Sequence, residues 1–109
     1  MVNRELPQPQ QKSKQVVLVV DDEKPLAQAI AATLDLEGLE TVLAYDGTQA
    51  LELTRKLHPD LILLDVMMPG KSGFEVCSTI KQDPATASIP VIILTAKTEL
   101  SDRMAGISA

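Results

Sequence analysis

Aromatic residues are almost absent from this sequence, which has one Phe, one Tyr and no Trp among its 109 residues. Because 45% of the residues are nevertheless hydrophobic, a core must be built from aliphatic side chains such as Val, Ile, Leu and Ala. Aliphatic cores of this kind are typical of parallel sheets that are buried on both faces. The length allows one compact domain and is too short for two.

Features of secreted and membrane proteins are also missing. The single cysteine, Cys77, excludes an internal disulfide bond and a cysteine metal cluster, and its helical setting predicts a buried thiol. No uncharged apolar run approaches the ~20 residues that a membrane span needs, and the N-terminus lacks the apolar core of a signal peptide. We therefore expect a protein of the reducing cytoplasm with no membrane association.

Basic residues are too few and too scattered for a surface that binds polyanions. Ten Lys and Arg residues stand against 15 Asp and Glu, which gives a net charge of -5. Binding to nucleic acid or to an anionic membrane requires clustered Lys and Arg. Any direct contact with DNA is therefore expected to lie outside this segment.

Three short aliphatic runs have the character of buried strands, and a further short strand is expected at Glu40–Ala44. Before the first run, residues 1–15 are rich in Gln, Pro and Lys and have no periodic apolar pattern. Such a segment buries too little apolar surface to offset the entropy of ordering. We expect a mobile polar tail over 1–15, a domain over 16–109, and strands at Val16–Val20, Glu40–Ala44, 61–64 and Val91–Leu94.

Between these runs, apolar residues recur at helical spacing. Leu26, Ile30 and Leu34 form such a stripe, which Gly38 ends, and Asp46 is a candidate N-cap for the next helix. Further helices are predicted through residues 74–80 and from residue 98 to residue 107. Strands that alternate with helices indicate an α/β fold with a parallel sheet and right-handed crossovers.

Polar side chains stand at the ends of three of the predicted strands. Asp21 and Asp22 follow the first strand, Asp65 follows the third, and Thr95 follows the fourth. Ligands of parallel α/β sheets bind outside the carboxyl ends of the strands. We expect three carboxylates and one hydroxyl to meet at this edge of the sheet.

Three carboxylates in one place repel one another unless a cation neutralises them. A hard, oxygen-seeking ion such as Mg²⁺ suits this set of ligands. An aspartate beside bound Mg²⁺ is able to attack a phosphorus atom and form an acyl phosphate. A hydroxyl at Thr95 that bonds a phosphoryl oxygen would draw its own loop inward, which is a switch in physical terms.

Three segments resemble the receiver domains of two-component response regulators: Val-Val-Asp-Asp-Glu at 19–23, Leu-Leu-Asp-Val-Met-Met-Pro-Gly at 63–70 and Ile-Leu-Thr-Ala at 93–96. The motifs and their spacing both match, from about Val16 to the last residue. The resemblance implies a doubly wound, flavodoxin-like (CheY-like) parallel sheet with strand order 2-1-3-4. It also implies a cytoplasmic phosphoprotein of a phosphorelay, which undergoes its own phosphorylation and slow dephosphorylation without being a conventional enzyme.

The same resemblance implies a role for each site residue. Asp65 is both the phosphoacceptor and a member of the metal site, and Asp22 is a direct Mg²⁺ ligand. Asp21 acts mainly through metal-bound water, and the backbone carbonyl of Met67 completes the protein ligands. Thr95 is the switch hydroxyl. The phosphoryl donor is a phosphohistidine on a sensor histidine kinase or a phosphotransfer protein, for which small acyl phosphates substitute.

Receiver domains normally continue past residue 109 into a fifth strand and a fifth helix. The fifth strand ends in a lysine that contacts the phosphoryl group, and Lys97 is not its equivalent because it stands two residues after the threonine. Without a fifth strand, Val91–Leu94 is expected to be an exposed apolar edge that pairs with another chain. We expect either a fragment of a longer protein or a homodimeric or strand-swapped assembly that supplies the missing strand.

Two other functions compete with the phosphoacceptor. A receiver-like docking or scaffold module would keep the fold without the chemistry; the missing lysine favours it, whereas the acidic pair, Asp65 and Thr95 favour phosphorylation. A phosphohydrolase with an aspartyl-phosphate intermediate would need a second aspartate two residues after the nucleophile. Position 67 is Met, which argues against the hydrolase.

Overall fold

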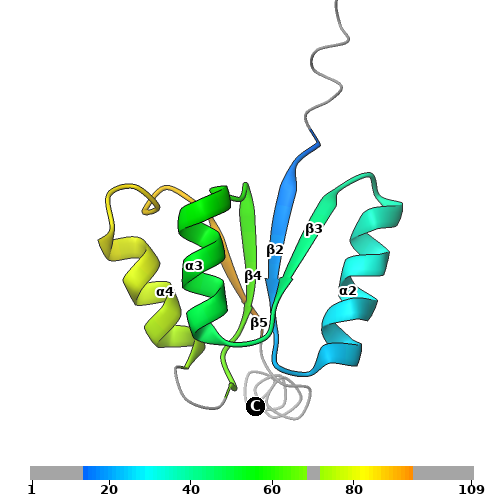
Figure 1. Cartoon of the computed structure of the whole chain (residues 1–109), viewed down its shortest axis with the longest axis horizontal. Helices are drawn as coiled ribbons and strands as arrows, with labels where there is room; N and C mark the ends of the chain where they lie inside the picture. Colours follow the sequence, from blue (N-terminus) through cyan, green and yellow to red (C-terminus); the bar gives the residue numbers. More distant parts are fainter. Residues whose placement is uncertain (1–13, 69–71, 95–109) are drawn as a thin grey trace, which may run out of the picture.

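A computed structural model describes residues 14–68 and 72–94 of the chain. Within these ranges strands and helices alternate as the sequence predicted. The elements carry the labels of Figure 1, which run from β2 to β5 and from α2 to α4. The predicted tail, the helix from residue 98 and Thr95 lie outside the described residues, apart from Lys14 and Gln15 of the tail. The strands are β2 (Val16–Val20), β3 (Glu40–Ala44), β4 (Leu61–Asp65) and β5 (Val91–Leu94), and the helices are α2 (Lys24–Leu36), α3 (Gly47–Leu57) and α4 (Gly73–Gln82).

The strands form one parallel sheet in the order β3-β2-β4-β5. Since β2 is the first strand described, this order is the 2-1-3-4 arrangement that the resemblance implied. β2 lies in the middle, and Val20 aligns with Ala44 of β3 and Leu64 of β4. The carboxyl ends of the two central strands therefore lie side by side.

Helices cover both faces of the sheet, with α2 on one face and α3 and α4 on the other (Figure 1). Alternate residues of β2 supply the two cores. Leu18 and Val20 pack on the side of α3 and α4, whereas Val17 and Val19 pack with Ala27 of α2. Because the central strands β2 and β4 are covered on both faces, they read in the sequence as continuous aliphatic runs.

The stripe predicted for α2 is partly wrong. Ile30 and Leu34 pack against the core, but Leu26 is 40% exposed, and the residues buried in the helix are Ala27 and Ala31. Alanine has a short side chain, so these two positions bring the helix backbone close to the sheet. Leu26, one residue earlier, is turned out towards solvent.

Asp46 caps α3 as the sequence predicted. Its side chain accepts a hydrogen bond from the Gln49 N–H at 2.8 Å. We expect Asp46→Ala to lower the free energy of unfolding by about 1 kcal/mol, because one N–H of the first turn loses its partner. Denaturant unfolding would measure this loss, with the exposed Glu52→Ala on the same helix as the control. Equal stability of the two variants would contradict the capping role.

β5 forms one edge of the described sheet and pairs with β4 on its inner side. Ile92 on this strand is half exposed. Pairing of this edge with a second chain stays a prediction. Among the described residues, no helix combines the length and the apolar character that crossing a bilayer would demand.

Candidate functional site

Three aspartates meet at the carboxyl-terminal edge of the sheet. Asp65 is the last residue of β4, and Asp21 and Asp22 directly follow β2. The Asp21 N–H donates to the carbonyl oxygen of Ala44 at 3.0 Å, which continues the pairing of β2 with β3 for one more residue. The neighbouring central strands thus deliver all three carboxylates to one place, at the lower end of the sheet in Figure 1.

The three carboxylates form a compact cluster. Each offers an oxygen, and these oxygens all lie within 4.8 Å of one another. Asp21 is 3% exposed and Asp65 is 9% exposed, while Asp22 is half-buried. A cluster that is buried on its inner side and open on its outer side is accessible to an ion and to an incoming donor.

Backbone N–H groups fix two of these carboxylates. The Glu23 N–H donates to Asp21 Oδ1 at 2.9 Å, and the Met67 N–H donates to Asp65 Oδ1 at 3.2 Å. Each bond joins a carboxylate to the residue two positions later, so the turn that follows the strand orients the side chain. No hydrogen bond from the described residues reaches Asp65 Oδ2, which leaves that oxygen available for chemistry.

Burial raises the pKa of the Asp65 carboxyl group above its ordinary value. The negative charges of Asp21, Asp22 and Glu23 raise this pKa further, and the hydrogen bond from Met67 opposes the rise. The charged form of Asp65 is therefore disfavoured in the protein alone. A cation at the cluster would favour the charged form, because it offsets both the desolvation and the repulsion.

The donor set fits a hard divalent cation. All three side chains offer carboxylate oxygens, which Mg²⁺ and Ca²⁺ prefer over softer ligands. The described residues supply too few ligands for a closed Ca²⁺ cage, whereas Mg²⁺ usually keeps several waters and binds through one or two carboxylates. The arrangement is thus able to hold Mg²⁺ beside a nucleophilic carboxylate.

The structure brings together Asp21, Asp22 and Asp65, as the sequence predicted. The Met67 backbone lies against Asp65 through its N–H, while the role of its carbonyl as a metal ligand stays a prediction. Thr95 lies outside the described residues. The adjacent strand position, Leu94, aligns with Asp65 in the register of β4 and β5.

Sequence reasoning missed the contribution of Gly73. This glycine begins α4, and its N–H donates to the carbonyl oxygen of Val66 at 3.2 Å. A Cβ at this position would meet the Asp65 carbonyl oxygen and lie 2.6 Å from the Val66 Cα. The only sequence signal was a glycine in the loop after Asp65, which does not reveal such a close backbone contact.

We expect Asp65→Asn to raise the Tm of the metal-free protein by several degrees at pH 7. A carboxyl group whose pKa is raised in the folded state binds its proton more tightly there than in the unfolded chain. Stability therefore falls as the pH rises from about 3.8, the ordinary value, through the raised pKa, and the loss is complete above it. Asparagine carries no charge and escapes this loss.

The stability advantage of Asp65→Asn should shrink as the pH is lowered through the raised pKa of Asp65. It should also shrink when Mg²⁺ is added, since a ligand of the folded state stabilises the wild type more than a variant that has lost a ligand. Thermal unfolding across pH, with the exposed Asp60→Asn as the control, measures both effects. A Tm of Asp65→Asn below that of wild type at pH 7 would contradict the electrostatic account.

Comparison with known proteins gives a consistent family match. A sequence model of the response regulator receiver domain matches residues 17–109. The chain is 43% identical over 96 residues to the DNA-binding response regulator MtrA of Mycobacterium tuberculosis (strain ATCC 25618 / H37Rv), a match that covers 88% of this chain and 41% of that protein. The chain thus spans less than half the length of the curated relatives that it matches.

Solved structures match in sequence and in fold. The N-terminal domain of a response regulator receiver protein from Methanoculleus marisnigri JR1 is 41% identical with a TM-score of 0.75, over 78% of this chain and 69% of that chain. The Vibrio cholerae chemotaxis protein CheY4 is 29% identical with a TM-score of 0.72, over 85% of this chain and 80% of that chain. These proteins share the parallel α/β architecture described above.

Proposed function

This chain belongs to the response regulator receiver domain family, and from that premise we propose that it is a phosphoacceptor signalling module in which Asp65 receives a phosphoryl group in a Mg²⁺-dependent reaction. The observation that carries the proposal is the cluster of Asp21, Asp22 and Asp65, whose oxygens lie within 4.8 Å of one another at the carboxyl ends of adjacent strands. The phosphoryl donor is a phosphohistidine of a sensor histidine kinase or a phosphotransfer protein.

Asp65 acts through Oδ2, the oxygen that receives no hydrogen bond from the described residues. Its Oδ1 is held by the Met67 N–H at 3.2 Å, so Oδ2 is the nucleophile that attacks phosphorus. The new bond joins Oδ2 to phosphorus, the bond from phosphorus to the donor nitrogen breaks, and the leaving imidazole takes the electron pair. The Met67 N–H keeps the carboxylate from rotating during this displacement.

The groups proposed to hold Mg²⁺ are the carboxylates of Asp22, Asp65 and Asp21 and the backbone carbonyl of Met67, with Asp21 acting through bound water. Bound Mg²⁺ supplies positive charge against the anionic phosphoryl oxygens. Asp21 is almost fully buried and accepts the Glu23 N–H, so its carboxylate is held in place by the turn. Asp22 is more exposed than Asp21 and Asp65.

Thr95 is proposed as the hydroxyl that reads the phosphorylated state. It follows Leu94, whose strand position pairs with Asp65 and whose carbonyl oxygen accepts the Val66 N–H at 3.3 Å. A hydrogen bond from the Thr95 hydroxyl to a phosphoryl oxygen would pull on the end of β5. This pull would transmit phosphorylation to the surface that a partner reads.

The module undergoes its own phosphorylation and slow hydrolysis, so we propose that it is not a conventional enzyme. We propose that it works in the cytoplasm, where sensor kinases present their phosphohistidines. MtrA is a DNA-binding response regulator, whereas the net charge of -5 argues against DNA contact by the chain itself.

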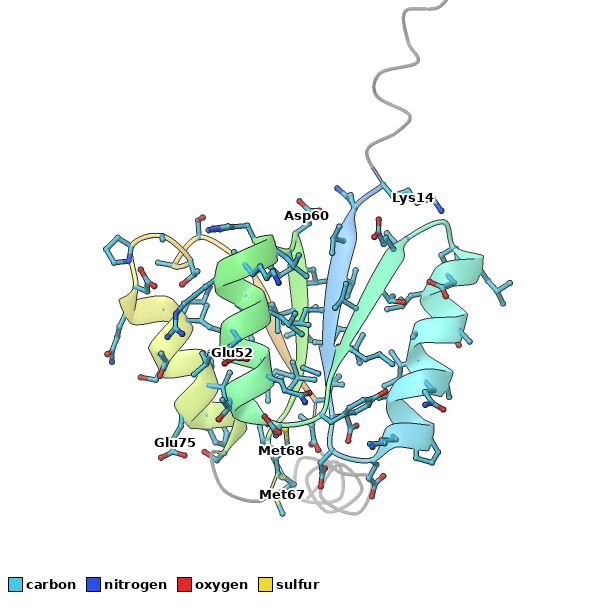
Figure 2. The ribbon with its side chains drawn as sticks, viewed as in Figure 1. Lys14, Glu52, Asp60, Met67, Met68 and Glu75 are labelled. Carbon is cyan, nitrogen blue, oxygen red and sulfur yellow. The ribbon has the colours of Figure 1, made fainter. Side chains whose placement is uncertain are left out.

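Intact mass after incubation with Mg²⁺ and acetyl phosphate tests the function. We expect wild type to gain one phosphoryl group, Asp65→Asn to gain none, and Asp60→Asn to gain as much as wild type. Asp60 is a suitable control because it is exposed and stands at the opposite end of the sheet from Met67 and Met68 (Figure 2). A folded wild type that gains no mass would exclude phosphorylation of Asp65 by this donor and favour a docking module.

A further inference from the structure

The loop after Asp65 contains two adjacent methionines in opposite environments. Met67 is 55% exposed, whereas Met68 is 8% exposed and belongs to the core between the sheet, α3 and α4. Figure 2 shows both below the strand ends, with Met67 further out. Oxidants reach a thioether in proportion to its exposure, so Met67 is expected to react well before Met68.

Met67 is also tied directly to the carboxylate at the centre of the site. Its N–H donates to Asp65 Oδ1 at 3.2 Å. The preceding residue, Val66, is buried, and its carbonyl oxygen accepts the Gly73 N–H at 3.2 Å. The peptide group between Val66 and Met67 is thus held at its carbonyl oxygen and at its N–H, so the Met67 side chain starts from a backbone position that is tied to Asp65.

We propose that Met67 is a modification site, where a peroxide oxidises the thioether to a sulfoxide that slows phosphoryl transfer to Asp65. The sulfur lone pair attacks one peroxide oxygen, and the O–O bond breaks. The departing hydroxide takes up a proton and leaves as water, so sulfur is oxidised and the peroxide is reduced. The regulatory effect rests on the proposed role of Asp65 as the phosphoacceptor.

The physical reason for the slower transfer is charge. A sulfoxide turns an apolar side chain into a polar one whose oxygen is negative at the outer end of its dipole. The site already holds the carboxylates of Asp21, Asp22 and Asp65, and the incoming phosphoryl group is anionic. A further negative oxygen on the side chain two residues after Asp65 disfavours the approach of the anionic donor, whereas oxidation of an exposed side chain leaves the core unchanged.

The test treats the whole chain with hydrogen peroxide and follows each methionine by peptide mass. We expect Met67 to gain one oxygen while Met68 remains reduced. The rate of phosphorylation by acetyl phosphate is then compared before and after treatment within each chain. Wild type should slow about threefold to tenfold, the range for one polar interaction, and methionine sulfoxide reductase should restore the rate.

Met67→Leu is the matched variant. It keeps Met1, Met68 and Met104, so any effect of oxidising those methionines is the same in the variant and in wild type. After treatment Met67→Leu should keep its own untreated rate. Oxidation of Met68 as fast as Met67, or equal slowing of wild type and Met67→Leu, would overturn the inference while leaving the proposed function intact. A chain that accepts no phosphoryl group before treatment would instead contradict the proposed function and, with it, the regulatory effect of Met67.

Discussion

Asp22→Asn will slow phosphorylation of Asp65 by acetyl phosphate by about two to three orders of magnitude at limiting Mg²⁺. The reason is that a bound cation supplies several kcal/mol of charge stabilisation in such a transfer, and each factor of ten in rate corresponds to about 1.4 kcal/mol. Asp22 is the most exposed of the three clustered aspartates. Its replacement removes a ligand without creating a cavity, so the fold should remain intact. The rate is followed by intact mass as Mg²⁺ is raised.

Glu23→Gln is the control for Asp22→Asn. Glu23 is exposed, and its negative charge contributes to the raised pKa of Asp65, but its side chain is not part of the carboxylate cluster. The two variants remove one charge each and differ only in the loss of a ligand. Asp22→Asn should need far more Mg²⁺ for the same rate, whereas Glu23→Gln should follow the wild-type Mg²⁺ dependence. Identical Mg²⁺ dependence of all three chains would rule out Asp22 as a ligand.

The central strands could be predicted because a parallel strand covered on both faces leaves a continuous aliphatic run in the sequence. Val16–Val20, Glu40–Ala44 and Val91–Leu94 were predicted with the bounds that the structure has. Helix faces were harder. The periodicity of α2 is satisfied by Leu26 as well as by Ala27, and hydrophobicity alone favours the larger residue. The helix packs closely through Ala27 instead, which depends on the space above the sheet.

The convergence of the carboxylates could also be predicted, since parallel strands present their carboxyl ends at one edge. What the sequence could not supply was the detail set by the backbone. The choice of Asp65 Oδ1 as the oxygen held by the Met67 N–H follows from the turn geometry. The closeness of Gly73 to Val66 depends on how α4 approaches β4, which no local pattern encodes.

Gly73→Ala should lower the free energy of unfolding by about 1–3 kcal/mol, the usual result of forcing an extra methyl group into packed atoms. The added Cβ would meet backbone atoms of Asp65 and Val66, and backbone cannot rotate away as the end of a long side chain can. Relief requires α4 to move from β4 or the turn after Asp65 to shift. The same change should weaken Mg²⁺ binding, because Met67 lies in that turn.

Gly38→Ala is the control for Gly73→Ala. It shows how much stability is lost when a glycine is replaced at a position without a close backbone contact. Gly38 has a φ of +86°, which alanine adopts poorly, and open space surrounds its Cβ position. Its replacement should therefore destabilise the chain by about 1 kcal/mol through backbone strain and leave Mg²⁺ affinity unchanged. Denaturant unfolding and Mg²⁺ titration on both variants give the comparison. If Gly73→Ala and Gly38→Ala bound Mg²⁺ equally well, the packing of α4 against the turn would not position the site, and the turn hydrogen bonds of Asp21 and Asp65 would suffice to hold it.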